Sequence, residues 1–266
     1  MKIASWNVNS LNVRLPHLQR WLDEAKPDVV ALQETKQEDH KFPEDALLEL
    51  GYRSQYCGQK TYNGVAIVSR LPFAGECVHA IPGFDDPQKR VLAATVGAPG
   101  SSDPGQAIRI VDLYVVNGEA VGSEKFDYKL RWLAAVREWL REEIALHPNL
   151  VVLGDFNIAP DDRDVWDPKR WREKILCSTP EREALQSVFA LGLHDSFRLF
   201  NEEAGHHSWW DYRLSGFERG WGLRIDLVLV SEALKARCTA AGIDREPRGW
   251  ERPSDHTPVF VEIADA

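Results

Sequence analysis

The sequence predicts an α+β protein, a four-layered α/β sandwich in which two packed, mixed but largely antiparallel β-sheets are flanked by helices. Eight strand-like apolar segments recur along the 266 residues, and only three helical patterns separate them. The two types do not alternate in strict βαβ order, which favours packed sheets with helices outside them. No repeat, low-complexity tract or linker divides the chain, so we expect one catalytic domain over residues 1–266.

The predicted strands are short apolar runs bounded by polar or turn-forming residues. They cover residues 2–7, 29–33, 64–69, 91–96, 108–116, 150–153, 225–230 and 259–263. Between two of these runs, residues 97–106 are rich in glycine, proline and serine. This composition predicts a hairpin turn or a surface loop there.

Three segments show helical patterns. Leu15 and Leu18 fall on one face of a helix that begins near Arg14. A longer helix over Glu124–Leu146 has apolar residues on one side and charges on the other, and it stops just before a proline. A third helix begins at Thr179, a capping residue followed by proline in the first turn.

The composition is typical of a globular protein, with 44% hydrophobic and 27% charged residues. Neither a signal-peptide pattern nor an apolar run of membrane-spanning length is present in the sequence. The cysteines at positions 57, 77, 177 and 238 have no CxxC or Cys/His spacing, which predicts reduced thiols. We therefore expect a cytoplasmic monomer with no membrane partner.

The net charge of −9, from 32 basic and 41 acidic residues, argues against a nucleic-acid partner, because such proteins usually carry a basic surface. The distribution of charge weakens this objection. Basic and aromatic residues alternate in segments 169–172, 219–224 and 248–252, and six of the ten tryptophans lie between residues 166 and 250. The overall sign of the charge alone does not decide the partner.

Small polar clusters end or interrupt five of the apolar runs. They are Ser5-Trp6-Asn7, Gln33-Glu34, Gly154-Asp155-Phe156-Asn157, Arg224-Ile225-Asp226 and Ser254-Asp255-His256. A single cluster of this kind is explained by a strand that ends in a loop. Five clusters from distant parts of the chain instead predict an active site built on rigid elements. Carboxylates, amides and one imidazole suit a hard divalent cation and phosphate chemistry.

Two of these clusters suggest a metal and a water molecule. Asp155 and Asn157 are two residues apart and point the same way on a strand, which suits holding and activating water near a phosphate. Glu34 ends an interior-type strand and suits Mg²⁺. Asn7 would add oxygen ligands beside Glu34. Each of these residues also has a purely structural explanation. Asp155, Asn157 and Asn7 would then form strand-ending turns, and Glu34 would be a solvated strand end.

His256 suits binding of a phosphate as imidazolium, or polarising of water, with a carboxylate from elsewhere to fix its tautomer. Asp226 is the candidate carboxylate, because it lies in an otherwise apolar strand where a charge needs a partner. A direct pair between Asp255 and His256 would need a bend in the strand. From the residues alone, packing is the favoured interpretation of Tyr114.

The aromatic segment 208–213 precedes Gly220-Trp221-Gly222. Adjacent aromatic residues in a glycine-bordered loop suit stacking on an unpaired nucleotide, and the alternative is a loop anchored by buried tryptophans.

Taken together, these motifs resemble the exonuclease III family of abasic-site (AP) endonucleases, within the endonuclease/exonuclease/phosphatase superfamily. The matching motifs run in order from residue 6 to residue 258. The resemblance implies a DNA repair nuclease that uses Mg²⁺, or Mn²⁺ in its place. It would act in base-excision repair, hydrolysing the phosphodiester 5′ to abasic sites in double-stranded DNA. It also implies 3′–5′ exonuclease and 3′-phosphatase or phosphodiesterase action on 3′-blocked ends.

The resemblance also assigns roles to residues near the metal and the water. It implies Asn7 and Glu34 near the metal, with Asp255 near a second metal position. Asp155 would activate water or protonate the leaving group. Asn157 would stabilise the pentacovalent state.

Further roles implied by the resemblance concern the phosphate and the DNA. Tyr114 would contact the phosphate or the leaving oxygen, and His256, oriented by Asp226, would bind the phosphate. The residues implied to contact DNA are Trp209, which would line the abasic sugar pocket, Arg90 and Asn117. Val116 stands where the family usually has proline.

Two other functions are weighed against this one. The first is another phosphodiesterase or phosphatase of the superfamily, acting on RNA, inositol phosphate or a phospholipid head group. The acidic charge favours it and the aromatic segment disfavours it. The second is a DNA-binding or scaffold protein without catalysis, which the complete set of polar clusters argues against.

Overall fold

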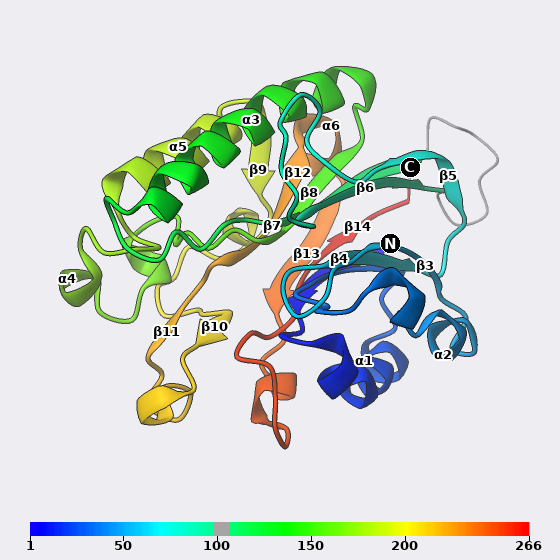
Figure 1. Ribbon diagram of the computed structural model, residues 1–266, viewed down its shortest axis with the longest axis horizontal. Coiled ribbons are helices and arrows are strands. Elements are labelled where there is room, and N and C mark those ends of the chain that lie inside the picture. The colour runs from blue at the N-terminus through cyan, green and yellow to red at the C-terminus, as the bar shows by residue number, and fades with distance from the viewer. Residues whose placement is uncertain (98–106, 266) are drawn as a thin grey trace.

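Two six-stranded β-sheets pack face to face in the computed structural model, which describes residues 1–97 and 107–265 (Figure 1). The first sheet has the order β13 (Cys238–Ile243), β14 (Val259–Ile263), β1 (Lys2–Asn7), β2 (Val29–Gln33), β4 (Val65–Ser69) and β3 (Arg53–Cys57). The second has the order β5 (Phe73–Val78), β6 (Val91–Val96), β7 (Ile108–Tyr114), β8 (Leu150–Asp155), β12 (Asp226–Ser231) and β9 (Leu193–Asp195). A separate pair is formed by β10 (Trp209–Trp210) and β11 (Gly222–Leu223).

Helices cover both outer faces, so the four-layered α+β sandwich is confirmed (Figure 1). On the side of the first sheet lie α1 (Leu11–Ala25) and α2 (Glu44–Leu48). On the side of the second lie α3 (Glu124–Leu146) and α5 (Thr179–Phe189). The shorter helices are α4 (Pro168–Trp171) and α6 (Glu232–Lys235). None of the helices in the described residues combines the length and the apolar composition needed to cross a membrane.

Strand alternation explains the layers. In β1, Ile3 points into the apolar core between the sheets, while Ala4 and Trp6 pack in the cluster that joins the first sheet to α1. A third cluster, which includes Val152 and Trp132, fills the space between the second sheet and its helices. The interior strands are buried on both faces and therefore read as continuous apolar runs.

The structure confirms the interior strands and adds strands that the sequence did not indicate. The four additional strands of the large sheets, β3, β5, β9 and β13, are the four sheet edges. Three of them are partly exposed along most of their length. Because one side of an edge strand faces solvent, its sequence does not need a continuous apolar run.

Some boundaries differ from the prediction. Helix α1 begins at Leu11, three residues before Arg14, because Leu11 is also buried on its apolar face. Strand β7 ends at Tyr114 and not at residue 116, while β8 continues to Asp155, where those two residues pair. Strands β6 and β7 pair antiparallel on either side of the predicted turn, but residues 98–106 of that turn lie outside the described residues.

Candidate active site

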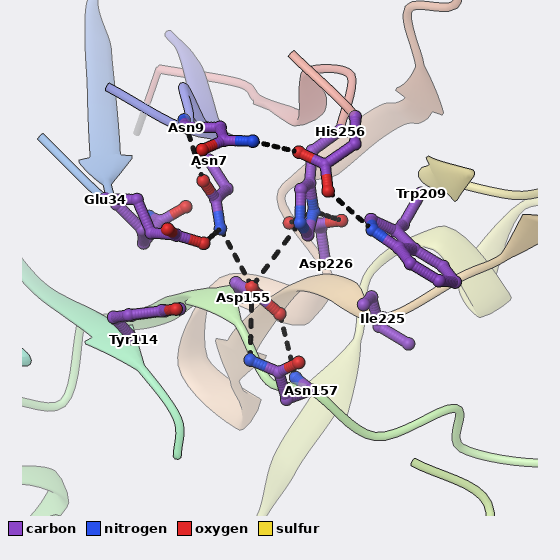
Figure 2. A network of polar contacts seen from close by, with 12 residues as sticks. Asn7, Asn9, Glu34, Tyr114, Asp155, Asn157, Trp209, Ile225, Asp226 and His256 are labelled. Carbon is purple, nitrogen blue, oxygen red and sulfur yellow. Dashed lines mark hydrogen bonds and ion pairs between the residues drawn. The ribbon is translucent and has the colours of Figure 1, made fainter. Parts of the chain in front are cut away.

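The polar strand ends meet at one end of the two sheets, as Figure 2 shows. Strands β1 and β2 are parallel, and so are β7 and β8, so the carboxyl ends of each pair lie at a common edge. Strand β12 runs antiparallel to β8 and begins there, with Asp226 opposite Asp155. Residues from opposite sheets and from both ends of the chain therefore share one site.

Asn7 connects the two sheets at this edge. Its Nδ2 donates to Glu34 Oε1 and to Asp155 Oδ2, both at 2.9 Å. Its Oδ1 accepts a 3.0 Å hydrogen bond from the main-chain nitrogen of Asn9. The amide nitrogen of Asn7 thus faces two carboxylates and holds them together (Figure 2).

Glu34 turns into the site because the backbone after β2 adopts a left-handed conformation, with φ of 54° at this residue. Lys36 lies 2.8 Å away, Nζ to Oε2. Burial acts to raise the pKa of Glu34, but Lys36 and the hydrogen bond from Asn7 outweigh it and hold the pKa below its usual value. The carboxylate is therefore ionised at neutral pH.

Asp155 and Asn157 come together, but through a turn and not through strand alternation. Strand β8 ends at Asp155, and Asn157 has φ of 49°. The main-chain nitrogen of Asn157 donates to Asp155 Oδ1 at 2.9 Å, and its Nδ2 to Oδ2 at 3.3 Å. Burial raises the pKa of Asp155 to about 7, although His256 opposes the rise.

His256 lies against Asp226. Its Nδ1 is 2.9 and 3.0 Å from the two carboxylate oxygens, and its Nε2 is 3.7 Å from Asp155 Oδ2. Burial acts to lower the pKa of His256, but the carboxylates of Asp226 and Asp155 raise it to about 10. The imidazole is therefore a cation at neutral pH, with Nε2 directed toward Asp155.

Tyr114, Arg90 and Asn117 line one cleft together with Glu34. The guanidinium of Arg90 is 4.6 Å from the centre of the Tyr114 ring and donates to its main-chain oxygen at 3.2 Å. Burial, reinforced by Glu34 and Asp155, raises the pKa of Tyr114 well above its usual value, so the hydroxyl stays protonated. Asn117 Nδ2 donates to Asn157 Oδ1 at 3.0 Å.

Asp255 lies beside Trp209. Its Oδ2 accepts a 3.0 Å hydrogen bond from Trp209 Nε1, and its Oδ1 accepts a 2.9 Å hydrogen bond from Asn9 Nδ2. The side chains of Asp255 and His256 therefore have different partners, although Asp255 lies at a bend before β14 and not within a strand. The metal role of Asp255 stays a prediction.

A group of possible metal ligands lies at the centre of the site. Ligand atoms of Glu34, Asp155 and His256 all lie within 4.8 Å of one another. Two carboxylates provide the oxygen ligands that a hard divalent cation prefers, while the Nδ1 of His256 is already bonded to Asp226. The donor set fits a divalent cation held by the carboxylates.

Sequence reasoning assigned no role to three supporting residues. Lys36 pairs with Glu34, and Ser208 Oγ donates to Asp226 Oδ2 at 2.6 Å. Lys129 is fully buried and donates to the main-chain oxygen of Asn157 at 2.7 Å. A signal for Lys129 was present, since this lysine falls on the apolar face of α3, where a charge needs a partner.

Comparisons with known proteins agree with this geometry. Residues 4–256 match the model of the Endonuclease/Exonuclease/phosphatase family. The chain is 36% identical to exodeoxyribonuclease III of Haemophilus influenzae, over 99% of this chain and 100% of that protein. Among solved structures it resembles the 3′ phosphatase NExo from Neisseria bound to a product DNA hairpin, with TM-score 0.94 and 49% identity over 99% of both chains. It also resembles an AP endonuclease from Archaeoglobus fulgidus, with TM-score 0.91 and 33% identity over 99% of both chains.

Proposed function

Because this chain belongs to the exonuclease III family of endonuclease/exonuclease/phosphatase proteins and is a DNA repair nuclease, we propose that it hydrolyses the phosphodiester 5′ to abasic sites in duplex DNA, using Mg²⁺. The observation that carries the proposal is the joining of Glu34 and Asp155 by Asn7, with His256 only 3.7 Å from Asp155. A metal-binding group, a base and a cation thus lie within reach of one phosphate.

Asp155 is the candidate base for the attacking water. Its pKa of about 7 allows the carboxylate to accept a proton near neutral pH. Hydrogen bonds from Asn7 to Oδ2 and from the main-chain nitrogen of Asn157 to Oδ1 hold both carboxylate oxygens, so the position of the group is set before substrate binds. The same group, once protonated, is also a candidate donor to the leaving 3′ oxygen.

His256 and Tyr114 are candidates for contacts with the phosphate. The His256 imidazolium offsets negative charge that develops on the phosphate oxygens, and Asp226 and Ser208 hold its orientation. The protonated hydroxyl of Tyr114 is able to donate a hydrogen bond. Asn157 stays a candidate for stabilising the pentacovalent state, for which its Nδ2 would exchange its present hydrogen bonds to the main-chain oxygen of Val115 and to Asp155 Oδ2.

Glu34, next to Asp155, would hold the metal ion, with Mn²⁺ as the alternative to Mg²⁺. A bound divalent cation supplies charge neutralisation at the phosphate and lowers the pKa of water. Asn7 contributes by keeping the two carboxylates side by side, where they would otherwise repel each other. The ionised state of Glu34 suits this role, since carboxylate ligands must be deprotonated.

Basic residues around the site support a DNA substrate despite the net charge of −9. A cleft of about 570 Å³ beside Glu34 and Tyr114 is also lined by Lys36, Arg90 and Lys125, of which Lys36 pairs with Glu34 and Lys125 with Glu119. A neighbouring cleft adds Lys41 and Lys60. Lysines and arginines along such a path provide phosphate contacts without sequence preference.

A second candidate function is the removal of 3′-phosphates and 3′-terminal nucleotides. The observation in its favour is the 49% identity to the NExo protein of Neisseria, described as a 3′ phosphatase and as a 3′–5′ exonuclease. The same residues serve both functions, because each reaction breaks a phosphate ester next to a 3′ oxygen. A monomeric state and a cytoplasmic location stay predictions from the sequence.

One gel tests these proposals. Duplexes with an abasic site, with no lesion and with a 3′-phosphate end are incubated with the protein in Mg²⁺ and in EDTA. We expect Mg²⁺-dependent cleavage of the abasic duplex and release of phosphate from the blocked end. Cleavage in EDTA contradicts the metal role, and an intact abasic duplex beside a dephosphorylated end selects the second candidate. No reaction on any duplex rejects both.

A further inference from the structure

An aromatic cavity of about 570 Å³ adjoins the candidate active site. Its walls contain four tryptophans, Trp166, Trp171, Trp209 and Trp221. Trp209 also belongs to the active-site network, because its indole nitrogen donates to Asp255. We call this space the tryptophan cavity. Its volume lies within the range of pockets that bind small organic groups.

The tryptophan cavity has a rigid wall with cations along it. Trp166 and Trp221 stack with ring centres 4.8 Å apart and planes at 15°. Trp166 is tied to β11 by a 3.1 Å hydrogen bond from its main-chain nitrogen to Gly222. The guanidiniums of Arg170 and Arg219 lie 5.6 and 4.6 Å from the rings of Trp166 and Trp221.

The exposure of the four indoles indicates a ligand. All four are partly exposed, although they come from three separate segments of the chain. Three of them, Trp166, Trp171 and Trp209, pack with one side against a small buried cluster, and their other sides form a contiguous apolar surface of the kind that marks ligand-binding grooves. By contrast, Trp210, next to Trp209, is buried and packs edge-on against Phe217. The loop is thus anchored by one tryptophan and leaves its neighbour available.

The ligand that fits this lining is a nucleobase. Flat aromatic side chains stack on bases of any sequence, and arginines beside them suit the attached phosphates. Arg170 lines the cavity, and so does Arg213, which is paired with Asp211 of the same lining at 2.6 Å. A base within a duplex is stacked and paired, so only an unpaired base is free to enter.

We propose that the tryptophan cavity binds an unpaired nucleobase of the DNA strand being hydrolysed, next to the scissile phosphate. This rests on the proposed function only in taking DNA as the substrate. The consequence is a preference among substrates. Strand ends whose last base is mismatched or frayed are bound more tightly than ends of the same length that lack that base.

The test measures binding of the full chain in EDTA, so that no turnover is needed. One duplex carries an unpaired 3′-terminal 2-aminopurine, and a matched duplex carries a baseless residue there. With the wild-type protein we expect quenching of 2-aminopurine fluorescence by indole stacking. Trp221→Leu is expected to weaken binding of the 2-aminopurine duplex about tenfold and to leave the baseless duplex unchanged.

Two further variants separate stacking from folding. Trp221→Phe keeps an aromatic face and is expected to retain most of the affinity for the 2-aminopurine duplex. Trp250→Leu removes an indole that packs against His17 and Arg20 and does not line the cavity, so it is expected to bind both duplexes as the wild type does.

Equal weakening of both duplexes by Trp221→Leu overturns the proposal, as does the absence of quenching with the wild type. Absence of quenching is the result expected if the tryptophan cavity binds a segment of another protein instead of a nucleobase. Hydrolysis plays no part in this binding measurement. A protein that cleaves DNA but shows no dependence on the terminal base therefore contradicts only this inference and not the proposed function. A protein that binds neither duplex contradicts the proposed function as well.

Discussion

The ammonium group of Lys129, which is fully buried, donates a 2.7 Å hydrogen bond to the main-chain oxygen of Asn157. The same ammonium group donates to the main-chain oxygen of Asn117 at 3.1 Å, and it pairs with the Glu181 carboxylate at 2.5 Å. An ion pair between α3 and α5 thus supports two asparagines of the site from behind. This support explains how Asn157 keeps its left-handed backbone conformation.

Lys129→Met is expected to lower the free energy of unfolding by about 3–5 kcal/mol, because it leaves the Glu181 carboxylate buried without its partner. The double variant with Glu181→Met is expected to recover much of that loss. Lys125→Met breaks an exposed ion pair with Glu119 and should change stability by at most about 1 kcal/mol. Urea denaturation measures all three, and similar values for both lysines would contradict the prediction.

Gly154→Ala is expected to destabilise the strand end that carries Asp155. Gly154 has φ of 141°, and a Cβ atom there would lie 1.9 Å from the main-chain oxygen of Leu113. The backbone must shift, which we expect to destabilise the fold by at least about 1–3 kcal/mol and to disturb the site. Gly249→Ala, where a Cβ atom meets nothing within 4 Å, is the control in thermal unfolding. A Gly154→Ala protein as stable and as active as that control would count against this account.

Glu34→Ala and Asp155→Asn are expected to fold but to lose at least about a hundredfold in Mg²⁺-dependent cleavage of an abasic duplex. The first removes a candidate metal ligand and the second the candidate base. Glu24→Ala, on the exposed face of α1, provides the control. Circular dichroism checks the fold of each protein. Near-normal turnover in either site variant would reject the role assigned to that residue.

Asp226→Asn is expected to lower kcat about a hundredfold with little change in KM, because an amide holds the His256 cation less strongly than a carboxylate. The effect falls on the transition state, where charge develops on the phosphate. Asp23 lies on the exposed side of α1, so the control variant Asp23→Asn should leave both kcat and KM unchanged. Steady-state kinetics on the abasic duplex decides the matter. A rise in KM alone would point instead to a role in substrate binding.

His207 is expected to make the fold sensitive to acid. Burial lowers its pKa from 6.5 to about 4, and Arg245 adds to the shift. Between these pH values the unfolded chain binds a proton that the folded chain does not. The contribution to stability is therefore complete above pH 6.5 and is lost as the pH falls toward 4.

Thermal unfolding at several pH values tests this prediction. The wild type should lose more stability than His207→Gln as the pH falls through that window. The exposed His40→Gln serves as the control, and its pH dependence should follow the wild type. Parallel curves for wild type and His207→Gln would show that His207 has no such effect.

The interior of both sheets could be read from the sequence, whereas the edges could not. Strands such as β2 and β4 are buried on both faces, so physical chemistry demands an unbroken apolar run. Edge strands such as β5 and β13 are half-exposed and carry mixed residues, and they form because a neighbouring strand offers hydrogen-bond partners. That neighbour is a property of the tertiary structure.

The candidate site divides in the same way. Glu34 and Asp226 stand out in sequence, because a carboxylate at the end of an apolar run or within one needs a reason, and His256 stands out beside them. What only the tertiary structure decided is their partners. Asn7 reaches Asp155 across the two sheets, over 148 residues of sequence, and Asp255 turns to Trp209. Hydrogen bonds act over about 3 Å, so contacts between distant segments depend on how the sheets pack and not on local pattern. The sequence alone determined which residue types are available for the proposed chemistry, and packing determined which atoms face one another.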